Sequence, residues 1–136
     1  MSDFGFAAAQ HVLGKALELT GAKFQRPICV AVCDPSGALL AFARQDGAPL
    51  RSVLISQGKA YTAARMGVTT QAFHERIARE QLQSRDFCDD RLTAVAGGAP
   101  LKNSAGKIVG AAGISGLTSA EDQEIANLLA EITSKL

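Results

Sequence analysis

The sequence predicts an α+β fold, a three-layer α–β–α sandwich in which helices flank a five-stranded antiparallel sheet. The chain has 136 residues and 47% of them are hydrophobic, so residues 1–136 suffice for one domain with a buried core. The expected elements follow the order α, β, β, α, α, β, β, β, α. Consecutive strands with short connections favour antiparallel pairing, because parallel neighbours need a crossover between each pair.

An amphipathic helix and a β-hairpin are expected first. Apolar residues at helical spacing predict a helix that ends near Gly21. Its expected buried face comprises Phe6, Ala9, Leu13, Ala16 and Leu17. Residues 27–45 have the pattern of a hairpin, with DPSG at 34–37 as a type I turn. The first strand is apolar on both faces, as expected when other elements cover both of its sides.

Two helices are expected after the hairpin. The first begins near Pro49, a residue suited to the first helical turn, and ends at Gly67. Its expected inward stripe comprises Leu50, Val53, Leu54, Gln57, Tyr61 and Ala64. The second helix lies within residues 69–83, starts at a threonine and turns Phe73 and Ile77 inward.

The last third of the chain is expected to contain three strands and a helix. The strands are predicted over residues 91–98, 99–103 and 107–116, with Gly97-Gly98 as a two-residue turn and Gly106 closing a second hairpin. The final helix has the clearest signals, a capping-box pattern at its start and a long apolar stripe. The capping pair is Thr118 and Glu121, and the stripe is Ile125, Leu128, Leu129, Ile132 and Leu136.

The glycines between residues 97 and 116 do not form a nucleotide-binding loop. A dinucleotide fingerprint needs its glycines between a strand and the following helix, whereas Gly110 and Gly113 fall inside a strand. The string required for a P-loop is absent. Glycines within a strand mark a place where a helix, another subunit or a flat ligand approaches closely. Packing and a ligand-facing surface therefore both stay open for these two positions.

Composition excludes several classes of partner. The chain has a formal net charge of +1, no basic cluster and no tryptophan, which disfavours nucleic-acid binding. No stretch approaches the roughly 18 apolar residues of a membrane span, and the N-terminal residues lack the pattern of a secretory signal. We therefore expect a cytoplasmic protein that binds neither nucleic acid nor membrane.

The cysteines do not indicate a disulfide or a metal site. Cys29 and Cys33 lie on one predicted strand, about 13 Å apart, which is too far for a disulfide or for shared ligation of one metal ion. They are best interpreted as small core residues. Cys88 has acidic neighbours that hinder thiolate formation. No metal site is expected.

Two blocks of sequence resemble those of the GlcG/HbpS family. They are DGAPLRSVLISQGKAYTAARMG at 46–67 and GGAPLKNSAGKIVGAAGISGLTSAEDQEIANLL at 97–129. The resemblance extends over nearly the whole chain and includes the early VAVCDPSGALLAF hairpin. It implies haem binding or degradation, a relation to the C-terminal domain of PduO-type proteins, a profilin- or roadblock-like five-stranded antiparallel sheet, and homo-oligomers. The family often has His where Ala38 stands and Met where Gln45 stands.

A haem site needs an apolar slot and an axial ligand. The candidate ligands are His11, His74, Cys29, Cys33, Cys88, Tyr61 and the two methionines, Met1 and Met66. His11 lies off the apolar stripe of its helix, and His74 lies beside Glu75 on a charged helix, where a solvated residue is expected. The sequence does not select one ligand from this set.

A second candidate site surrounds the segment ARQDGAP at 43–49. Arg44, Asp46 and Arg51 bracket a glycine before a helix, and Lys59 follows about two turns into that helix. These cations and the helix N-terminus would attract a carboxylate, with Asp46 as a general base and Arg44 beside it in catalysis, and Tyr61 could add a hydroxyl. Alternatively, Asp46 caps the helix while the arginines are solvated or join an interface.

Three functions are consistent with these patterns. The first is an oligomeric small-ligand-binding protein of the GlcG/HbpS type, with haem as the ligand that the resemblance implies. The second is an enzyme or accessory factor of a catabolic pathway that acts on a small carboxylated metabolite near Arg44 and Asp46. The third is an assembly protein without a small ligand. A serine–histidine–acid triad is not expected, since both histidines lie on helices without a placed serine.

Overall fold

The computed structural model describes residues 4–136 of the chain. Four α-helices, a short 3-10 helix and four strands follow one another in these residues. They are α1 (Phe6–Lys23), β1 (Cys29–Cys33), β2 (Leu39–Arg44), α2 (Ser52–Met66), α3 (Thr70–Glu80), η1 (Ser84–Phe87), β3 (Gly98–Lys102), β4 (Ile108–Ser115) and α4 (Ser119–Thr133). No helix in this part of the chain is long and apolar enough to cross a membrane.

The sheet has four strands, in the order β2-β1-β4-β3, and every neighbouring pair is antiparallel. The prediction of five strands is therefore wrong. The strand expected at 91–98 does not form, and only Gly98 belongs to β3. Gly97-Gly98 is consequently not a hairpin turn, whereas Gly106 does lie in the turn between β3 and β4, with a φ of 81°.

The segment before β3 packs on helices instead of pairing in the sheet. Leu92 is buried in a cluster with Tyr61, Phe73 and Ile77. The backbone N–H of Thr93 donates a hydrogen bond to the Thr62 hydroxyl on α2, at 2.9 Å. The Thr93 N–H, which would have bonded to a neighbouring strand if this segment had joined the sheet, is thus bonded to a side chain of α2.

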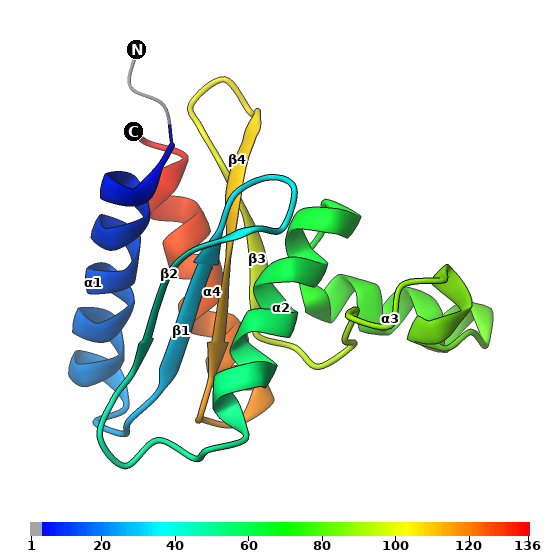
Figure 1. Cartoon of the computed structure of the whole chain (residues 1–136), viewed down its shortest axis with the longest axis horizontal. Coiled ribbons are helices and arrows are strands. Elements are labelled where there is room, and N and C mark those ends of the chain that lie inside the picture. The colour runs from blue at the N-terminus through cyan, green and yellow to red at the C-terminus, as the bar shows by residue number, and fades with distance from the viewer. Residues whose placement is uncertain (1–3) are drawn as a thin grey trace.

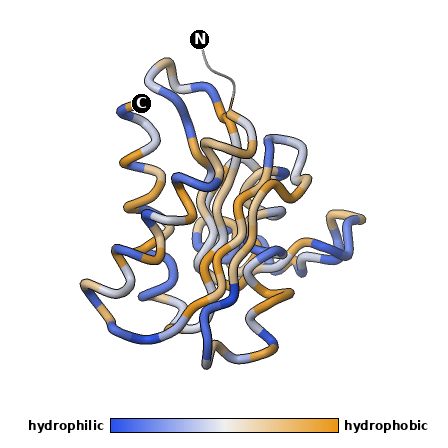
Figure 2. The backbone as a smooth tube through the Cα atoms, turned by 60° about the vertical axis from the view of Figure 1, so that its left-hand side comes forward, coloured by the Kyte–Doolittle hydropathy of each residue, from blue (hydrophilic) through white to orange (hydrophobic). Residues whose placement is uncertain are grey.

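Helices lie against both faces of the sheet (Figure 1). Val30, Val32 and Ile114 point to the face covered by α1 and α4. Ala31 and Ala111 point to the other face, where small residues of α2 cover them. Hydrophobic residues accordingly follow the strands through the middle of the molecule (Figure 2), and α3 extends away from the sheet (Figure 1).

Gly113 allows α2 to approach the sheet closely. A Cβ atom at this position would lie 2.0 Å from the carbonyl oxygen of Ser56 and 2.6 Å from the backbone nitrogen of Ala60. At Gly110, an added Cβ would lie 2.6 Å from the carbonyl oxygen of Cys33 and 2.8 Å from the ring of Phe4. Both glycines are thus surrounded by internal packing in this chain.

The inward faces of the first two helices differ from the predicted stripes. Leu50 and Leu54 are 75% and 76% exposed, and small or polar side chains face the sheet instead. The buried residues of α2 are Ser52, Ser56, Lys59, Ala60, Tyr61, Thr62, Ala63 and Ala64. On α1, Phe6 is 59% exposed, and the buried residues are Ala9, Val12, Ala16 and Thr20. Close contact between helix backbone and sheet selects small residues, which hydrophobicity alone does not identify.

The predicted helix ends were partly correct. Gly67 closes α2 in the left-handed conformation, with a φ of 70°. Thr118 and Glu121 form the capping box of α4, each side chain accepting the backbone N–H of the other. The helix α1 runs past Gly21 to Lys23, so the expected end at Gly21 is wrong.

Candidate functional site

Lys59 is buried inside the domain and bonded to internal groups. Its side chain is 1% exposed, and its Nζ donates hydrogen bonds to the Ile114 carbonyl at 2.7 Å and to Asp122 Oδ2 at 3.1 Å. Burial lowers the pKa of Lys59 and raises the pKa of Asp122, while the opposite charge of each partner counteracts the shift. A Cβ atom at Gly97 would lie 2.6 Å from Nζ. The ion pair therefore joins α2 to β4 and α4.

Gln123, the next residue of α4, holds the start of β3 and the start of α3 together. Its Oε1 accepts the Gly97 N–H at 2.7 Å, and its Nε2 donates to the Gly98 carbonyl at 3.0 Å. Thr70, at the start of α3, donates its hydroxyl to Gln123 Oε1 at 3.4 Å and accepts the Gly98 N–H at 2.8 Å. This buried network fixes α3 relative to α4.

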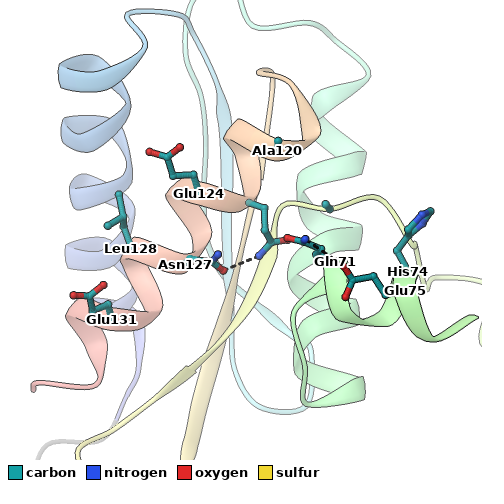
Figure 3. Close-up of a pocket in the computed structure, with 10 residues that line it drawn as sticks. Gln71, His74, Glu75, Ala120, Glu124, Asn127, Leu128 and Glu131 are labelled. Carbon is teal, nitrogen blue, oxygen red and sulfur yellow. Dashed lines mark hydrogen bonds between the residues drawn. The ribbon is translucent and has the colours of Figure 1, made fainter. Parts of the chain in front are cut away.

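A groove of about 490 Å³ lies between these two helices, and we call it the α3–α4 groove. It is lined by Gln71, His74, Glu75, Ala96, Ala120, Gln123, Glu124, Asn127, Leu128 and Glu131. Figure 3 shows Gln71, His74 and Glu75 on α3, and shows Glu124, Leu128 and Glu131 projecting from the side of α4 that lies away from α3 in this view. Apolar side chains, amides and one imidazole thus border a single hollow.

Three glutamates line this groove together with His74. Glu124 Oε2 lies 3.0 Å from Lys23 Nζ, and Glu131 Oε1 lies 3.9 Å from Lys135 Nζ. Glu75 accepts a hydrogen bond from Gln71, at 3.4 Å. Two of the three carboxylates therefore have a lysine beside them, so positive charge is available at the α4 rim of the groove.

A second groove, of about 600 Å³, lies at the end of the sheet where β2 finishes. It is lined by Gly21, Gln25, Arg26, Pro27, Arg44, Gln45 and Asp46, and we call it the Arg44 groove. Arg44 donates from Nε and Nη2 to the Ala48 carbonyl, at 3.3 and 3.1 Å. Gln45 Oε1 accepts the backbone N–H of Ile28, at 2.9 Å.

The structure brings only part of the predicted carboxylate site together. Arg44 and Asp46 line the same groove, while the exposed Arg51 precedes α2 and does not line it. Lys59 is enclosed by α2, β4 and α4. Tyr61 lies against Gly37 in the β1–β2 turn, at the opposite end of β2 from Arg44.

The sequence interpretation missed the residues that the turn after α1 contributes to this groove. These are Gln25, Arg26 and Pro27, which precede Arg44 by 17 to 19 positions. Their proximity follows from the register of β1 with β2, in which Cys29 pairs with Arg44. A predicted hairpin over 27–45 already implied that its two ends meet, so this signal was present in the sequence.

Tyr61 belongs to a separate cluster near the end of α2. Its hydroxyl donates to Asp89 Oδ2 at 2.6 Å, and the guanidinium carbon of Arg91 lies 3.9 Å from its ring centroid. This hydrogen bond raises the pKa of Tyr61 and lowers the pKa of Asp89. The side chain therefore has its partners in the segment between α3 and β3.

The candidate haem ligands occupy different environments. Cys29 and Cys33 are buried, and burial raises the pKa of the Cys33 thiol to about 12. Met66 is half-buried against the apolar cluster that contains Phe73 and Ile77, and Met1 lies outside the described residues. His11 is exposed on α1, and Cys88 is exposed after η1.

Among the candidate ligands in residues 4–136, His74 lines one of the two grooves and the others line neither. Within the same residues, no three His, Cys, Asp or Glu side chains are arranged to hold a metal ion. His74 is therefore the described side chain that combines an imidazole with a neighbouring hollow. Sequence spacing could not select it, since the facing residues of α4 lie about fifty positions away.

Comparison with known proteins identifies the family. A family model described as "Haem degrading protein HbpS-like" matches residues 4–130. The chain belongs to the HbpS-like family. The predicted resemblance to GlcG/HbpS proteins is thereby confirmed for nearly the whole chain.

Relatives of this HbpS-like chain cover almost its full length. A protein of Citrobacter freundii, described as an uncharacterized 15.0 kDa protein from the dhaT-dhaS intergenic region, is 32% identical over 133 residues, 95% of this chain and 92% of the relative. The crystal structure of a double mutant of Streptomyces reticuli HbpS has a TM-score of 0.83 and 26% identity, covering 97% of this chain and 88% of that one. The crystal structure of a PduOC–haem complex has a TM-score of 0.82 and 22% identity, covering 96% and 94%.

Proposed function

We propose that this HbpS-like protein binds haem in the α3–α4 groove, with the imidazole of His74 as the axial ligand. The observation that carries the proposal is the position of His74, the candidate ligand that lines a groove with apolar side chains. Membership of a family described by haem degradation supports haem as the ligand, and so does the resemblance in fold to a protein in complex with haem.

The residues of this groove fit the chemistry of haem. Neutral imidazole is a common ligand of haem iron, and the macrocycle needs apolar surface beside it. His74 provides the nitrogen, while Ala96, Ala120 and Leu128 provide apolar side chains. When bound, haem would supply a redox-active iron, and the protein would supply its position and surroundings.

The charges on the groove rim set the expected strength of binding. Haem carries two carboxylates, which the carboxylates of Glu75, Glu124 and Glu131 would repel. Lys23 and Lys135 lie beside two of these glutamates and would offset part of that repulsion. We therefore propose moderate affinity that depends on ionic strength.

The network around Gln123 would keep the two walls of the groove in place. Gln123 lines the groove from α4, and its bonds to Gly97, Gly98 and Thr70 reach the start of α3. His74 lies one turn further along α3. Gln123 is thus proposed as a positioning residue that fixes α3, and with it His74, relative to α4.

We also propose that the protein is a cytoplasmic homo-oligomer. Leu50, which lies just before α2, and Leu54, in the first turn of α2, are 75% and 76% exposed, which makes them suitable for burial between subunits. Cys29, Cys33 and Cys88 are free thiols, as is usual in a reducing compartment. Neither the proposed compartment nor the proposed assembly depends on haem binding.

Haemin titration of the purified protein tests the proposed ligand and the proposed site. We expect a sharp Soret band that saturates at a fixed stoichiometry. The band should be lost or shifted in His74→Ala and kept in His11→Ala, a matched control because His11 is also exposed on a helix but lines neither groove. A broad band that does not saturate would reject haem. A wild-type band in His74→Ala would reject the site.

A further inference from the structure

We infer that the Arg44 groove is a second ligand site, for a small carboxylate with a hydroxyl or ammonium group on the adjacent carbon. The groove is separate from the α3–α4 groove, with which it shares no lining residue. None of the candidate haem ligands lines it. The inference therefore stands or falls independently of haem binding.

Arg44 is the central group of this site. Its Nε and Nη2 both donate to the Ala48 carbonyl, so the guanidinium plane is held in one orientation although the side chain is exposed. Nη1 has no part in these two bonds. An arginine that is already oriented loses less conformational freedom when it binds a carboxylate, which favours binding.

Gln45 and Arg26 add further donors around the groove. The Oε1 of Gln45 accepts the Ile28 N–H, and this bond leaves its amide NH₂ group available as a donor. Arg26 uses Nη2 in its bond to Glu121, at 2.5 Å, which ties the turn after α1 to the start of α4. The remaining guanidinium donors of Arg26 are available to a ligand.

Asp46 determines which carboxylates would be preferred. It is exposed, lines the groove and takes part in no ion pair within residues 4–136. Arg26 is already paired with Glu121, so Arg44 is the guanidinium of this lining that has no ion-pair partner within residues 4–136, and it suits a ligand with a single carboxylate. The carboxylate of Asp46 can accept a hydrogen bond, so it favours a ligand with a donor group next to its own carboxylate.

A titration monitored by two-dimensional ¹H–¹⁵N NMR tests this site with three probes. The probes are lactate, alanine and propionate, which share a three-carbon carboxylate and differ in the hydroxyl, the ammonium or neither. We expect saturable shifts of the backbone amides of Gln25, Arg26 and residues 44–46 for lactate or alanine, and at least about fivefold weaker binding of propionate. A lower Kd for lactate than for alanine would identify a hydroxyl as the preferred donor group, and a lower Kd for alanine would identify an ammonium.

Variants separate this site from general surface binding. Arg44→Gln should weaken binding by about tenfold or more, whereas Arg79→Gln, on the exposed surface of α3, should leave it unchanged. Asp46→Asn should reduce the preference over propionate. Unchanged binding in both Arg44→Gln and Arg26→Gln, or shifts that never saturate, would overturn the inference. The Soret band of haemin should be the same in Arg44→Gln and wild type, so failure of one proposal is distinguishable from failure of the other.

Discussion

The ammonium group of Lys59 lies 3.1 Å from a carboxylate oxygen of Asp122, and the two side chains are 1% and 4% exposed. Nζ also reaches the Ile114 carbonyl, and Asp122 Oδ1 accepts the Leu117 N–H at 3.1 Å. The pair thus satisfies both charges inside the domain and connects α2, β4 and α4. Its removal from one side would leave an unpaired charge in the core.

Lys59→Met should destabilise the protein by about 3–5 kcal/mol, because the carboxylate of Asp122 would stay buried without its partner. Urea unfolding followed by circular dichroism measures this change. The double variant Lys59→Met/Asp122→Leu should recover much of the loss, since an apolar pair can replace a buried ion pair. Equal stability of the single variant and wild type would show that the pair is not buried as described.

Gly113→Ala should destabilise the protein by at least about 2 kcal/mol, because its Cβ would lie 2.0 Å from the Ser56 carbonyl oxygen and displace α2 from the sheet. Gly14→Ala is the matched control, since a Cβ there has no atom within 4 Å. This control lies within α1 and should stabilise the helix by about 0.5–1 kcal/mol. Thermal unfolding of both variants checks the opposite signs, and a tolerated alanine at Gly113 would contradict the close packing.

Glu121 should contribute to stability above pH 4.5 and lose that contribution as the pH falls. The ordinary pKa of a glutamate is 4.5, and in the folded state the pKa of Glu121 is lower than this. The main cause is the hydrogen bond from the Thr118 N–H, and the next is the hydrogen bond from Arg26. The unfolded chain therefore binds the proton first, and the stabilisation disappears as the pH drops through the lowered folded value. Glu121→Gln should show a shallower loss of melting temperature between pH 5 and pH 3 than wild type. An identical pH profile would argue against this linkage.

Glu75→Gln should tighten haem binding by about two- to fivefold, since it removes a negative charge that lines the α3–α4 groove beside His74. Glu80→Gln, on the same helix but outside the groove lining, serves as the control. Soret titrations at low and high salt should show that the gain shrinks at high salt. A similar gain in both variants would indicate a general effect of net charge.

Leu54→Glu should shift the protein towards smaller assemblies, because a charge on the exposed apolar surface of α2 would oppose association there. Light scattering coupled to size-exclusion chromatography measures the mass. Leu136→Glu is the control, as Leu136 is 65% exposed at the C-terminal end. An unchanged mass in Leu54→Glu would place any subunit contact elsewhere.

Signals that act over a few residues were correctly interpreted from the sequence. The capping box of Thr118 and Glu121, the end of α2 at Gly67 and the hairpin over 27–45 all depend on neighbours in the chain. Turn and cap chemistry is local, so its energy is decided by the residues that carry it. The family was also identifiable from the two blocks of sequence at 46–67 and 97–129, and the family model matches residues 4–130.

The sequence by itself thus determined the order of most elements, the antiparallel pairing and the family. Only the tertiary structure decided that residues 91–97 pack on α2 and α3 instead of forming a fifth strand, because Thr62 and Phe73 compete with the sheet for this segment. It also decided that Lys59 is an internal ion-pair partner and that His74 lines a groove. Both outcomes depend on residues of α4 that lie about fifty to sixty positions away in the chain. A local sequence pattern does not indicate which distant residue will pair with a buried charge or line the same groove.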